Sequence, residues 1–268
     1  WVLPWLADVP AWDFAVPGVT SLSVDLHKYA YTPKGVSLLL HANPQLRQPQ
    51  FFAHADWPGY TMLNSTTQST KSGGPLAAAW AVVNLIGADG YRDLVARTVD
   101  ATAEVARGIE AIDHLHLVEQ PETSLVVLGA DDALDVFTLS DLMLDRGWFV
   151  QPQMQFAGEP ANLHLTLCAA TAESVPQFLS ALAEAVTEAV ARGPIQIDPL
   201  LAQAAASLDP DSLDDEAFDG LLAIAGLAGE GGKVQAPERL GQVNALLDVA
   251  SPEVREALLV AFLDRLTR

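Results

Sequence analysis

The sequence contains few basic residues and almost no cysteine. Its 268 residues include 14 Lys and Arg against 34 Asp and Glu, giving a formal net charge of −20. Nucleic acids and anionic membrane surfaces both require clustered basic charge, so neither is expected as the main partner. Cys168 is the single cysteine, which excludes an intrachain disulfide framework and a cysteine-rich metal site. No apolar run reaches about 18 residues, so no membrane-spanning helix is expected.

The composition is nevertheless that of a folded chain, because half of the residues are hydrophobic and 18% are charged. The first residues, Trp1-Val-Leu-Pro-Trp-Leu6, include no initiator Met and no basic segment of the kind that opens a secretion signal. We therefore expect the sequence to begin inside a longer protein.

The first third of the chain shows strand and turn patterns. Residues 19–24 alternate apolar and polar side chains and predict a strand, while residues 36–41 predict a second strand buried on both faces. Lys28 lies in the connection between them, where a scaffold can hold it rigidly. Residues 43–74 are rich in Pro, Gln, Ser, Thr and Gly, which predicts a long loop of the kind that builds a site.

Helical and strand patterns alternate in the middle of the chain, and the last part is helical. Further strands are predicted at 124–128 and 163–168, and helices at 73–86, 90–112, 136–146 and 172–192. This alternation is typical of an α/β layer arrangement. Beyond Pro194 the apolar residues follow helical spacing, and we find no convincing strand.

The segment Ser21–Gly35 carries the clearest chemical signal. It places Lys28 and Lys34 close to His27 and Tyr31 at a strand end, a combination that suits amine catalysis. A nucleophilic lysine must be neutral, and partial burial or a neighbouring cation lowers its pKa toward neutrality. On composition alone, however, the same residues also describe a strand end with surface lysines.

The exact string favours the catalytic interpretation. His27-Lys28 followed by Tyr-x-Tyr-x-Pro-Lys-Gly35 resembles the cofactor-lysine segment of fold type I pyridoxal-phosphate enzymes. Within that fold it is most similar to the sphingosine-1-phosphate lyase branch of the group II decarboxylase superfamily. The resemblance covers roughly residues 1–192 and extends to the segments Asp56–Tyr60, Thr70–Trp80, Gly87–Tyr91, Arg146–Gln151 and His164–Cys168.

The resemblance implies catalytic roles for three residues and a cofactor contact for a fourth. Lys28 would link covalently to pyridoxal 5'-phosphate and be displaced by the substrate amine. His27 would contact the phosphate side of the cofactor. Lys34 would act near the substrate phosphate or in proton transfer, and Tyr31 would complete the catalytic set. No metal is implied.

The resemblance also implies a phosphate contact at a glycine pair. Gly73 and Gly74 match a turn whose backbone N–H groups approach the cofactor phosphate, and such groups suit an anion because they add donors without bulk. The family has Arg-Pro before this pair, whereas this sequence has Lys71-Ser72. Lysine keeps the charge of arginine and loses its bidentate geometry.

The other half of a cofactor site has no counterpart in the sequence. The family binds the ring with an aspartate at the pyridine nitrogen, a stacked histidine and an early phosphate-binding turn, all upstream of the lysine. Asp8, Asp13 and Asp25 do not occupy the family's aspartate position. Either an upstream segment completes the site, or the chain is a degenerate remnant.

The resemblance predicts an aspartate aminotransferase-like, fold type I α/β architecture, the fold of the pyridoxal-phosphate-dependent transferases. Residues 1–112 would form the C-terminal part of the large domain, residues 113–198 a small α+β domain, and residues 199–268 an acidic helical extension. We expect a cytoplasmic homodimer with shared active sites and a small-molecule amine as substrate.

Three functions remain open at this point. The first is retro-aldol cleavage of a phosphorylated 2-amino-alcohol to an aldehyde and an aminoalkyl phosphate, which the Pro-Lys-Gly35 string favours. The second is decarboxylation of an amino acid. The third is a non-catalytic scaffold of the same fold, in which the helical extension binds a partner.

Overall fold

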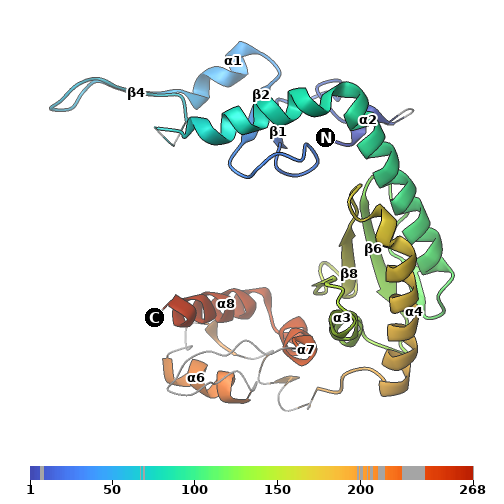
Figure 1. Cartoon of the computed structure of the whole chain (residues 1–268). Coiled ribbons are helices and arrows are strands. Elements are labelled where there is room, and N and C mark those ends of the chain that lie inside the picture. The colour runs from blue at the N-terminus through green and yellow to red at the C-terminus, as the bar shows by residue number, and fades with distance from the viewer. Residues whose placement is uncertain are drawn as a thin grey trace. The chain divides into compact units, whose positions relative to one another are not determined.

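The computed structural model describes residues 1–6, 9–66, 68, 70–197, 199, 202–203, 205, 208–210, 215–224 and 239–267. Asp8 and the expected domain boundary at Asp198 lie outside these residues. The chain divides into two compact units, Trp1–Val99 and Asp100–Arg268. Figure 1 follows the elements along the chain.

A two-stranded hairpin is the centre of the first unit. β1 (Ser21–Asp25) and β2 (Ser37–His41) pair antiparallel, which confirms both predicted strands. The prediction that the second strand is buried on both faces is wrong, because Leu39 is 52% exposed and its neighbours Leu38 and Leu40 are also exposed. The sheet has only these two strands, so the described residues provide no third strand or full covering layer for the leucines.

The segment predicted as a long loop contains short elements. They are α1 (Pro44–Arg47), η2 (Gln48–Gln50) and an antiparallel hairpin of β3 (Phe52–His54) and β4 (Met62–Asn64). Asn43 begins α1, because its side chain accepts a hydrogen bond from the N–H of Leu46 at 2.9 Å. Each element has only three or four residues, too few for a periodic signal among so many turn-forming residues.

α2 (Gly73–Glu110) is interrupted at Gly87, where φ is 62° and ψ is 179°. These angles confirm the two separate helices predicted on either side of this position. Just beyond the break, buried Tyr91 donates a hydrogen bond to the carbonyl of Ala30 at 2.9 Å. Its ring also packs edge-on against Trp1 and stacks on Trp5, which closes η1 (Leu3–Trp5). Tyr91 thus anchors the lysine turn to α2.

The second unit is built on a four-stranded antiparallel sheet. Its strands are β5 (Leu115–Leu117), β6 (Leu125–Ala130), β7 (Gln151–Gln153) and β8 (Asn162–Thr166), in the order β5-β6-β8-β7. β6 and β8 confirm the two strands predicted here, whereas β5 and β7 were not predicted.

Three helices pack on this sheet and form the main core. They are the end of α2, α3 (Val136–Asp145) and α4 (Val175–Arg192), with η3 (Ala172–Ser174) leading into α4. Asp135 begins α3, because its carboxylate accepts the N–H of Thr138 at 2.7 Å. The largest fully buried side chains of this core come from all three helices and from the sheet: Val105, Ile109, Val126, Leu128, Leu139, Leu142, Met143, Leu163, Val175 and Leu182.

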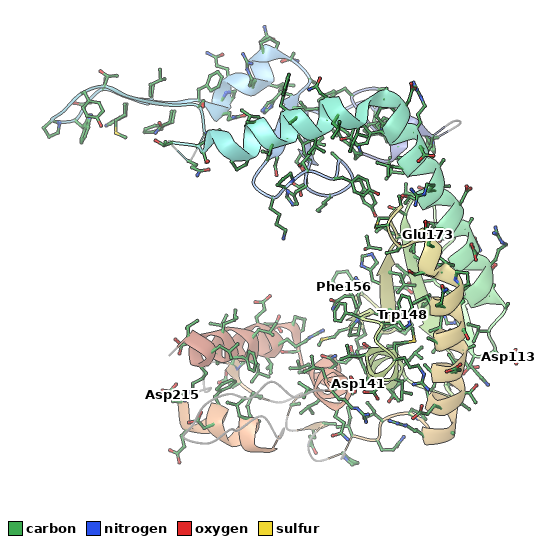
Figure 2. All side chains as sticks on the ribbon, viewed as in Figure 1. Asp113, Asp141, Trp148, Phe156, Glu173 and Asp215 are labelled. Carbon is green, nitrogen blue, oxygen red and sulfur yellow. The ribbon has the colours of Figure 1, made fainter. Side chains whose placement is uncertain are left out.

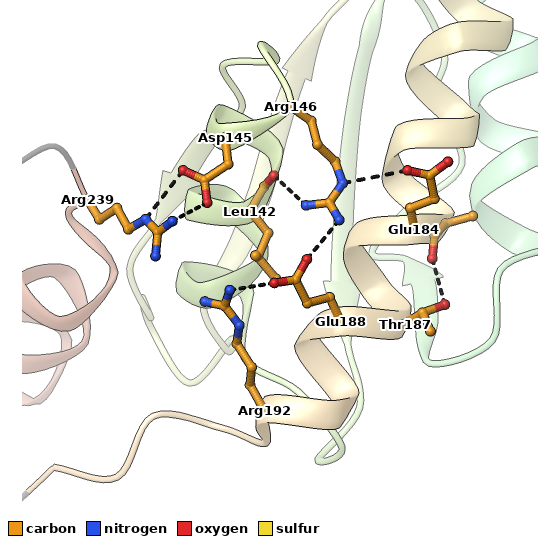
Figure 3. A network of polar contacts seen from close by, with 9 residues as sticks. Leu142, Asp145, Arg146, Glu184, Thr187, Glu188, Arg192 and Arg239 are labelled. Carbon is orange, nitrogen blue, oxygen red and sulfur yellow. Dashed lines mark hydrogen bonds and ion pairs between the residues drawn. The ribbon is translucent and has the colours of Figure 1, made fainter.

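A polar network joins α3 to α4 at the surface of this unit (Figure 3). Arg146 donates to the carbonyl of Leu142 at 3.0 Å and to the carboxylate of Glu188 at 2.8 Å, while its Nε lies 3.9 Å from Glu184. Arg192 also pairs with Glu188. Hydrogen bonds from Arg146 and then Arg192 lower the pKa of Glu188.

The last described elements are α6 (Asp215–Ile224), α7 (Gly241–Val249) and α8 (Pro252–Thr267). Phe218 and Leu222 of α6 form a small buried cluster against partly buried side chains of α7 and α8, among them Val243 and Phe262. This arrangement confirms the helical character predicted for the end of the chain. Within the described part of the chain, no helix is long and apolar enough to cross a membrane.

Candidate functional site

Lys28 lies in a tight turn directly after β1. Its N–H donates to the carbonyl of Asp25 and its carbonyl accepts the N–H of Tyr31 at 3.2 Å, so the turn is held by backbone bonds. Leu26 and Ala30 on either side are buried. The Lys28 side chain itself is 67% exposed. The fold therefore presents a reachable amine on a fixed backbone, as predicted for a lysine between two strands.

Asp25 is the carboxylate nearest to this amine, and sequence analysis assigned it no role. Its Oδ2 lies 3.4 Å from Nζ of Lys28 and 4.0 Å from Nε2 of His27. Its Oδ1 accepts a hydrogen bond from the hydroxyl of Ser37. The Ser37 hydroxyl, followed by Lys28 and His27, lowers the pKa of Asp25. Asp25 is therefore an anion fixed between the lysine and the second strand.

The partnership of Asp25 and Ser37 depends on strand register. The two residues face each other at the last position of the β1–β2 ladder. Asp25 and Lys28 are three residues apart across a turn, and this spacing in the sequence could have indicated their ion pair. Ser37 could be recognised only once the register was known.

Lys34 and Tyr31 follow in the same connection. Tyr31 has φ of 56°, a left-handed conformation uncommon for a residue other than glycine. Lys34 is exposed and forms no hydrogen bond or ion pair within the described residues. Gly35 has φ of 113°, and a Cβ there would lie 3.1 Å from the Pro75 side chain. This close approach brings the Lys34-Gly35 turn against the start of α2.

The glycine pair forms the first residues of α2. Gly73 and Gly74 are exposed, and a Cβ at Gly73 would meet nothing within 4 Å. The first N–H groups of a helix have no partner inside it, and they favour anions. Lys71 points elsewhere: its Nζ donates to the hydroxyl of Thr66 at 2.6 Å and to the carbonyl of Gln68 at 3.0 Å. The lysine that replaces the family's arginine is thus bonded within its own loop.

These residues fit one part of a pyridoxal phosphate site. The exposed amine of Lys28 is available to the aldehyde of the cofactor. The contact between Gly35 and Pro75 lies at the N-terminus of α2, which suits a phosphate. His27 adds a buried Nδ1 atom that has no partner in the described part of the chain. Asp13 is used locally, since its carboxylate accepts the N–H of Ala15 at 2.8 Å. The described residues include no counterpart of the aspartate that pairs with the pyridine nitrogen of the cofactor in the family.

The second unit contains a separate cavity of about 290 Å³. Its walls are mainly apolar. They include Trp148, labelled in Figure 2, and Phe178, whose ring centroids lie 5.4 Å apart in an edge-to-face arrangement. His164 also lines it, as do Thr171 and Ser174. Among the described residues, no group of three or more His, Cys, Asp or Glu side chains could hold a metal ion.

Comparison with known proteins shows similarity along most of the chain. A sphingosine-1-phosphate lyase from Oryza sativa is 33% identical over 188 residues, which cover 70% of this chain and 34% of the rice enzyme. The solved sphingosine-1-phosphate lyase of Burkholderia pseudomallei superposes with a TM-score of 0.65 at 31% identity, covering 72% of this chain and 44% of that protein. The resemblance to sphingosine-1-phosphate lyases is confirmed. The chain spans about a third of the length of the rice relative.

The fold extends beyond this group. A glutamate decarboxylase of Lactobacillus brevis superposes with a TM-score of 0.61 at 19% identity, covering 74% of this chain and 46% of that protein. The predicted fold class is therefore confirmed: the chain has part of the fold of the pyridoxal-phosphate-dependent lyases and decarboxylases. Residues 199–265 match a family described as "Pyridoxal-dependent enzyme, C-terminal putative HTH domain", where HTH denotes helix-turn-helix.

Proposed function

We propose that this chain carries the lysine segment of a pyridoxal-phosphate-dependent carbon–carbon lyase. Its substrate would be a phosphorylated 2-amino-alcohol, and its products an aldehyde and an aminoalkyl phosphate. The observation that carries the proposal is the position of Lys28: an exposed amine on a fixed turn, inside a segment similar to sphingosine-1-phosphate lyases.

Pyridoxal phosphate, when bound, supplies an aldehyde and a ring that takes up the electron pair of the broken bond. Lys28 would hold the cofactor through its amine at that aldehyde carbon, and the substrate amine would later take its place. When the Lys28 amine is not bonded to the cofactor, Asp25 holds it by an ion pair. Its second oxygen is bonded to Ser37, so the carboxylate keeps its orientation during this exchange.

The remaining proposed site residues serve the phosphates and protons. The exposed N–H groups of Gly73 and Gly74 would bind the cofactor phosphate, and His27 would contact the same side. Lys34 and Tyr31 would bind the substrate phosphate or move the proton of its hydroxyl group. The support is that Lys34 has no competing ion pair in the described part of the chain.

The experiment that tests this proposal compares two product assays on the native enzyme. A phosphorylated 2-amino-alcohol should yield an aldehyde, while aromatic and acidic amino acids should release little CO₂. The second candidate is an amino-acid decarboxylase, favoured by the fold shared with the glutamate decarboxylase. Faster CO₂ release than aldehyde formation would establish that alternative and reject the lyase.

The proposal includes an organisation for the whole protein. Residues 1–112 would belong to the large domain, residues 113–198 to the small domain and residues 199–268 to the helical extension. The division of the sequence into two compact units falls between Val99 and Asp100, inside α2. We also propose a cytoplasmic homodimer with shared active sites acting on a small-molecule amine; the resemblance to the lyase family supports this.

A further inference from the structure

The segment that matches the HTH family has the wrong charge for nucleic acid. Residues 199–265 contain twelve Asp and Glu against four Lys and Arg. Proteins that bind DNA or RNA without sequence preference do so by neutralising phosphates with Lys and Arg. Lys233 lies outside the described residues, and the other three basic residues are arginines with defined contacts.

Each of these arginines contacts a partner inside the chain. Arg265 of α8 donates to the carboxylate of Asp219 at 2.9 Å, and Arg255 donates to Sδ of Met154 at 3.3 Å. Arg239 pairs with the Asp145 carboxylate. Every arginine in the described part of the segment therefore has a partner within the chain.

Arg239 precedes α7 and pairs with Asp145 at the end of α3. Its Nη2 lies 2.6 Å from one carboxylate oxygen and its Nε 3.3 Å from the other (Figure 3). Two parallel N–H···O bonds fix both distance and orientation, which is the strongest common geometry of such a pair. This arginine therefore recognises a protein carboxylate with the same fork that it would use on a phosphate.

α7 depends on α3 for its N-terminal cap. The residue in the cap position, Leu240, has no side-chain acceptor. Instead the Asp141 carboxylate of α3 accepts the N–H of Leu240 at 3.0 Å and that of Gly241 at 2.9 Å, and Figure 2 labels Asp141 beside α7. An isolated helix of nine residues is marginal in water, and a negative charge at its N-terminus is favourable. Asp141 thus supplies what the α7 sequence lacks.

α7 also approaches α3 closely at Gly241, where a larger residue would displace the Asp141 carboxylate. A Cβ on Gly241 would lie 2.6 Å from Oδ2 of Asp141 and 3.1 Å from the backbone carbonyl of Phe137. Ala245, one turn further, is 7% exposed and belongs to the main core of the second unit. Small residues on one face of α7 therefore fit the surface of α3.

The other end of α7 is held as well. Gln155, which follows β7, donates its backbone N–H to the Asp248 carboxylate at 2.6 Å and its side-chain amide to the Asp248 carbonyl at 2.7 Å. α7 is thus fixed at both ends by the unit that carries the sheet.

We propose that the HTH-like segment is a protein-docking module whose partner is α3 of its own chain, and that α7 is its docking helix. Its recognition elements are the Asp141 cap, the Arg239–Asp145 pair and the close contact at Gly241. The segment braces the small domain and does not read nucleic acid. This assignment is independent of the reaction that the enzyme catalyses.

The first test measures amide hydrogen exchange across α7 in the full chain. Asp141→Ala removes the acceptor of two N–H groups and should speed exchange in residues 241–249 by about tenfold. Asp132→Ala is the matched control, because Asp132 is an exposed aspartate of the same unit that makes no polar side-chain contact with the described residues. Exchange in α7 that is equal in the two variants would overturn the proposal.

A second variant pair guards against a general loss of folding in Asp141→Ala. Gly241→Ala adds only a methyl group at the α3–α7 contact and should also speed exchange in α7, while β6 and β8 stay protected. Gly220→Ala adds the same group in α6, where a Cβ meets nothing within 4 Å, and should leave α7 unchanged. Unchanged exchange in Gly241→Ala would contradict the close contact.

The third arm addresses nucleic acid directly. Fluorescence anisotropy of a labelled mixed-sequence DNA duplex and of an RNA hairpin should show no binding by the full chain at low salt. Binding that weakens as salt is raised, and that Arg239→Ala reduces, would mean that the segment uses its arginines on phosphates, and would overturn the docking assignment.

Discussion

The two oxygens of Asp25 have different partners, and this division sets the electrostatics around Lys28. Oδ1 accepts the Ser37 hydroxyl, while Oδ2 faces Lys28 and, at longer range, His27. All three neighbours favour the ionised carboxylate, and the serine hydroxyl contributes most to the lowered pKa. A group with a lowered folded-state pKa stabilises the fold above its ordinary pKa and loses that contribution as pH falls through the lowered value.

Ser37→Ala should therefore raise the pKa of Asp25 toward its ordinary value. The variant's Asp25 would take up its proton at a higher pH, so the pair with Lys28 would be lost earlier on acidification. The measurement is an NMR titration of the Asp25 carboxyl carbon in both proteins. Ser23→Ala, at an exposed serine on the same hairpin, is the control and should leave the midpoint in place. An Asp25 midpoint unmoved by Ser37→Ala would show that the hydroxyl is not the main cause.

Sequence analysis singled out Lys28 but gave no role to Asp25, its ion-pair partner, and the reason is physical. Lys28 belongs to a contiguous string that resembles the cofactor-lysine segment of a known family. The Asp25–Ser37 contact joins residues twelve apart and exists only because the hairpin pairs them in one register. Contacts of this kind depend on tertiary structure and leave no local pattern.

At the scale of elements, Gly87 determines how α2 is divided. Its φ of 62° and ψ of 179° lie in a region that only glycine populates readily. A Cβ there would meet nothing within 4 Å, so backbone strain is the main penalty of any side chain.

Gly87→Ala should destabilise the protein by about 1–3 kcal/mol through this strain. Chemical denaturation of the two proteins measures the difference, with Gly220→Ala in α6 as the control for adding a methyl group at an ordinary helical glycine. A Gly87→Ala protein as stable as its parent would mean that α2 can pass this position as a continuous helix.

Prediction of the elements succeeded where the pattern was long. α3 and α4 present apolar stripes over ten and eighteen residues, and both were predicted close to their observed bounds. β5 and β7 have three residues each, which is too short for alternation to be recognised. In β2 the apolar run was predicted correctly as a strand, but an apolar run does not show whether another layer covers it.

For the molecule as a whole, the main core of buried side chains lies in the second compact unit. Leu182 of α4 is fully buried in the core of the second unit, whereas Leu85 of α2 in the first unit is 86% exposed. Removing buried methyl groups loses transfer free energy and leaves a cavity, while truncating an exposed side chain does neither.

Leu182→Ala should consequently lower the free energy of unfolding by about 2–5 kcal/mol. Leu85→Ala makes the same chemical change at an exposed position and should lie within about 0.5 kcal/mol of the parent. Urea denaturation followed by circular dichroism measures both values. Equal effects of the two substitutions would contradict the placement of the main core in the second unit.

The central claim is that Lys28 is the residue that binds the cofactor aldehyde. Borohydride reduces a C=N bond between a lysine and pyridoxal phosphate to a stable single bond, and peptide mapping then locates the modified residue. Labelling the native protein in this way should place the cofactor on Lys28; Lys28→Arg should abolish the label, and Lys34→Arg should retain it. A label on Lys34 or on another lysine, or a label of undiminished yield in Lys28→Arg, would contradict the account.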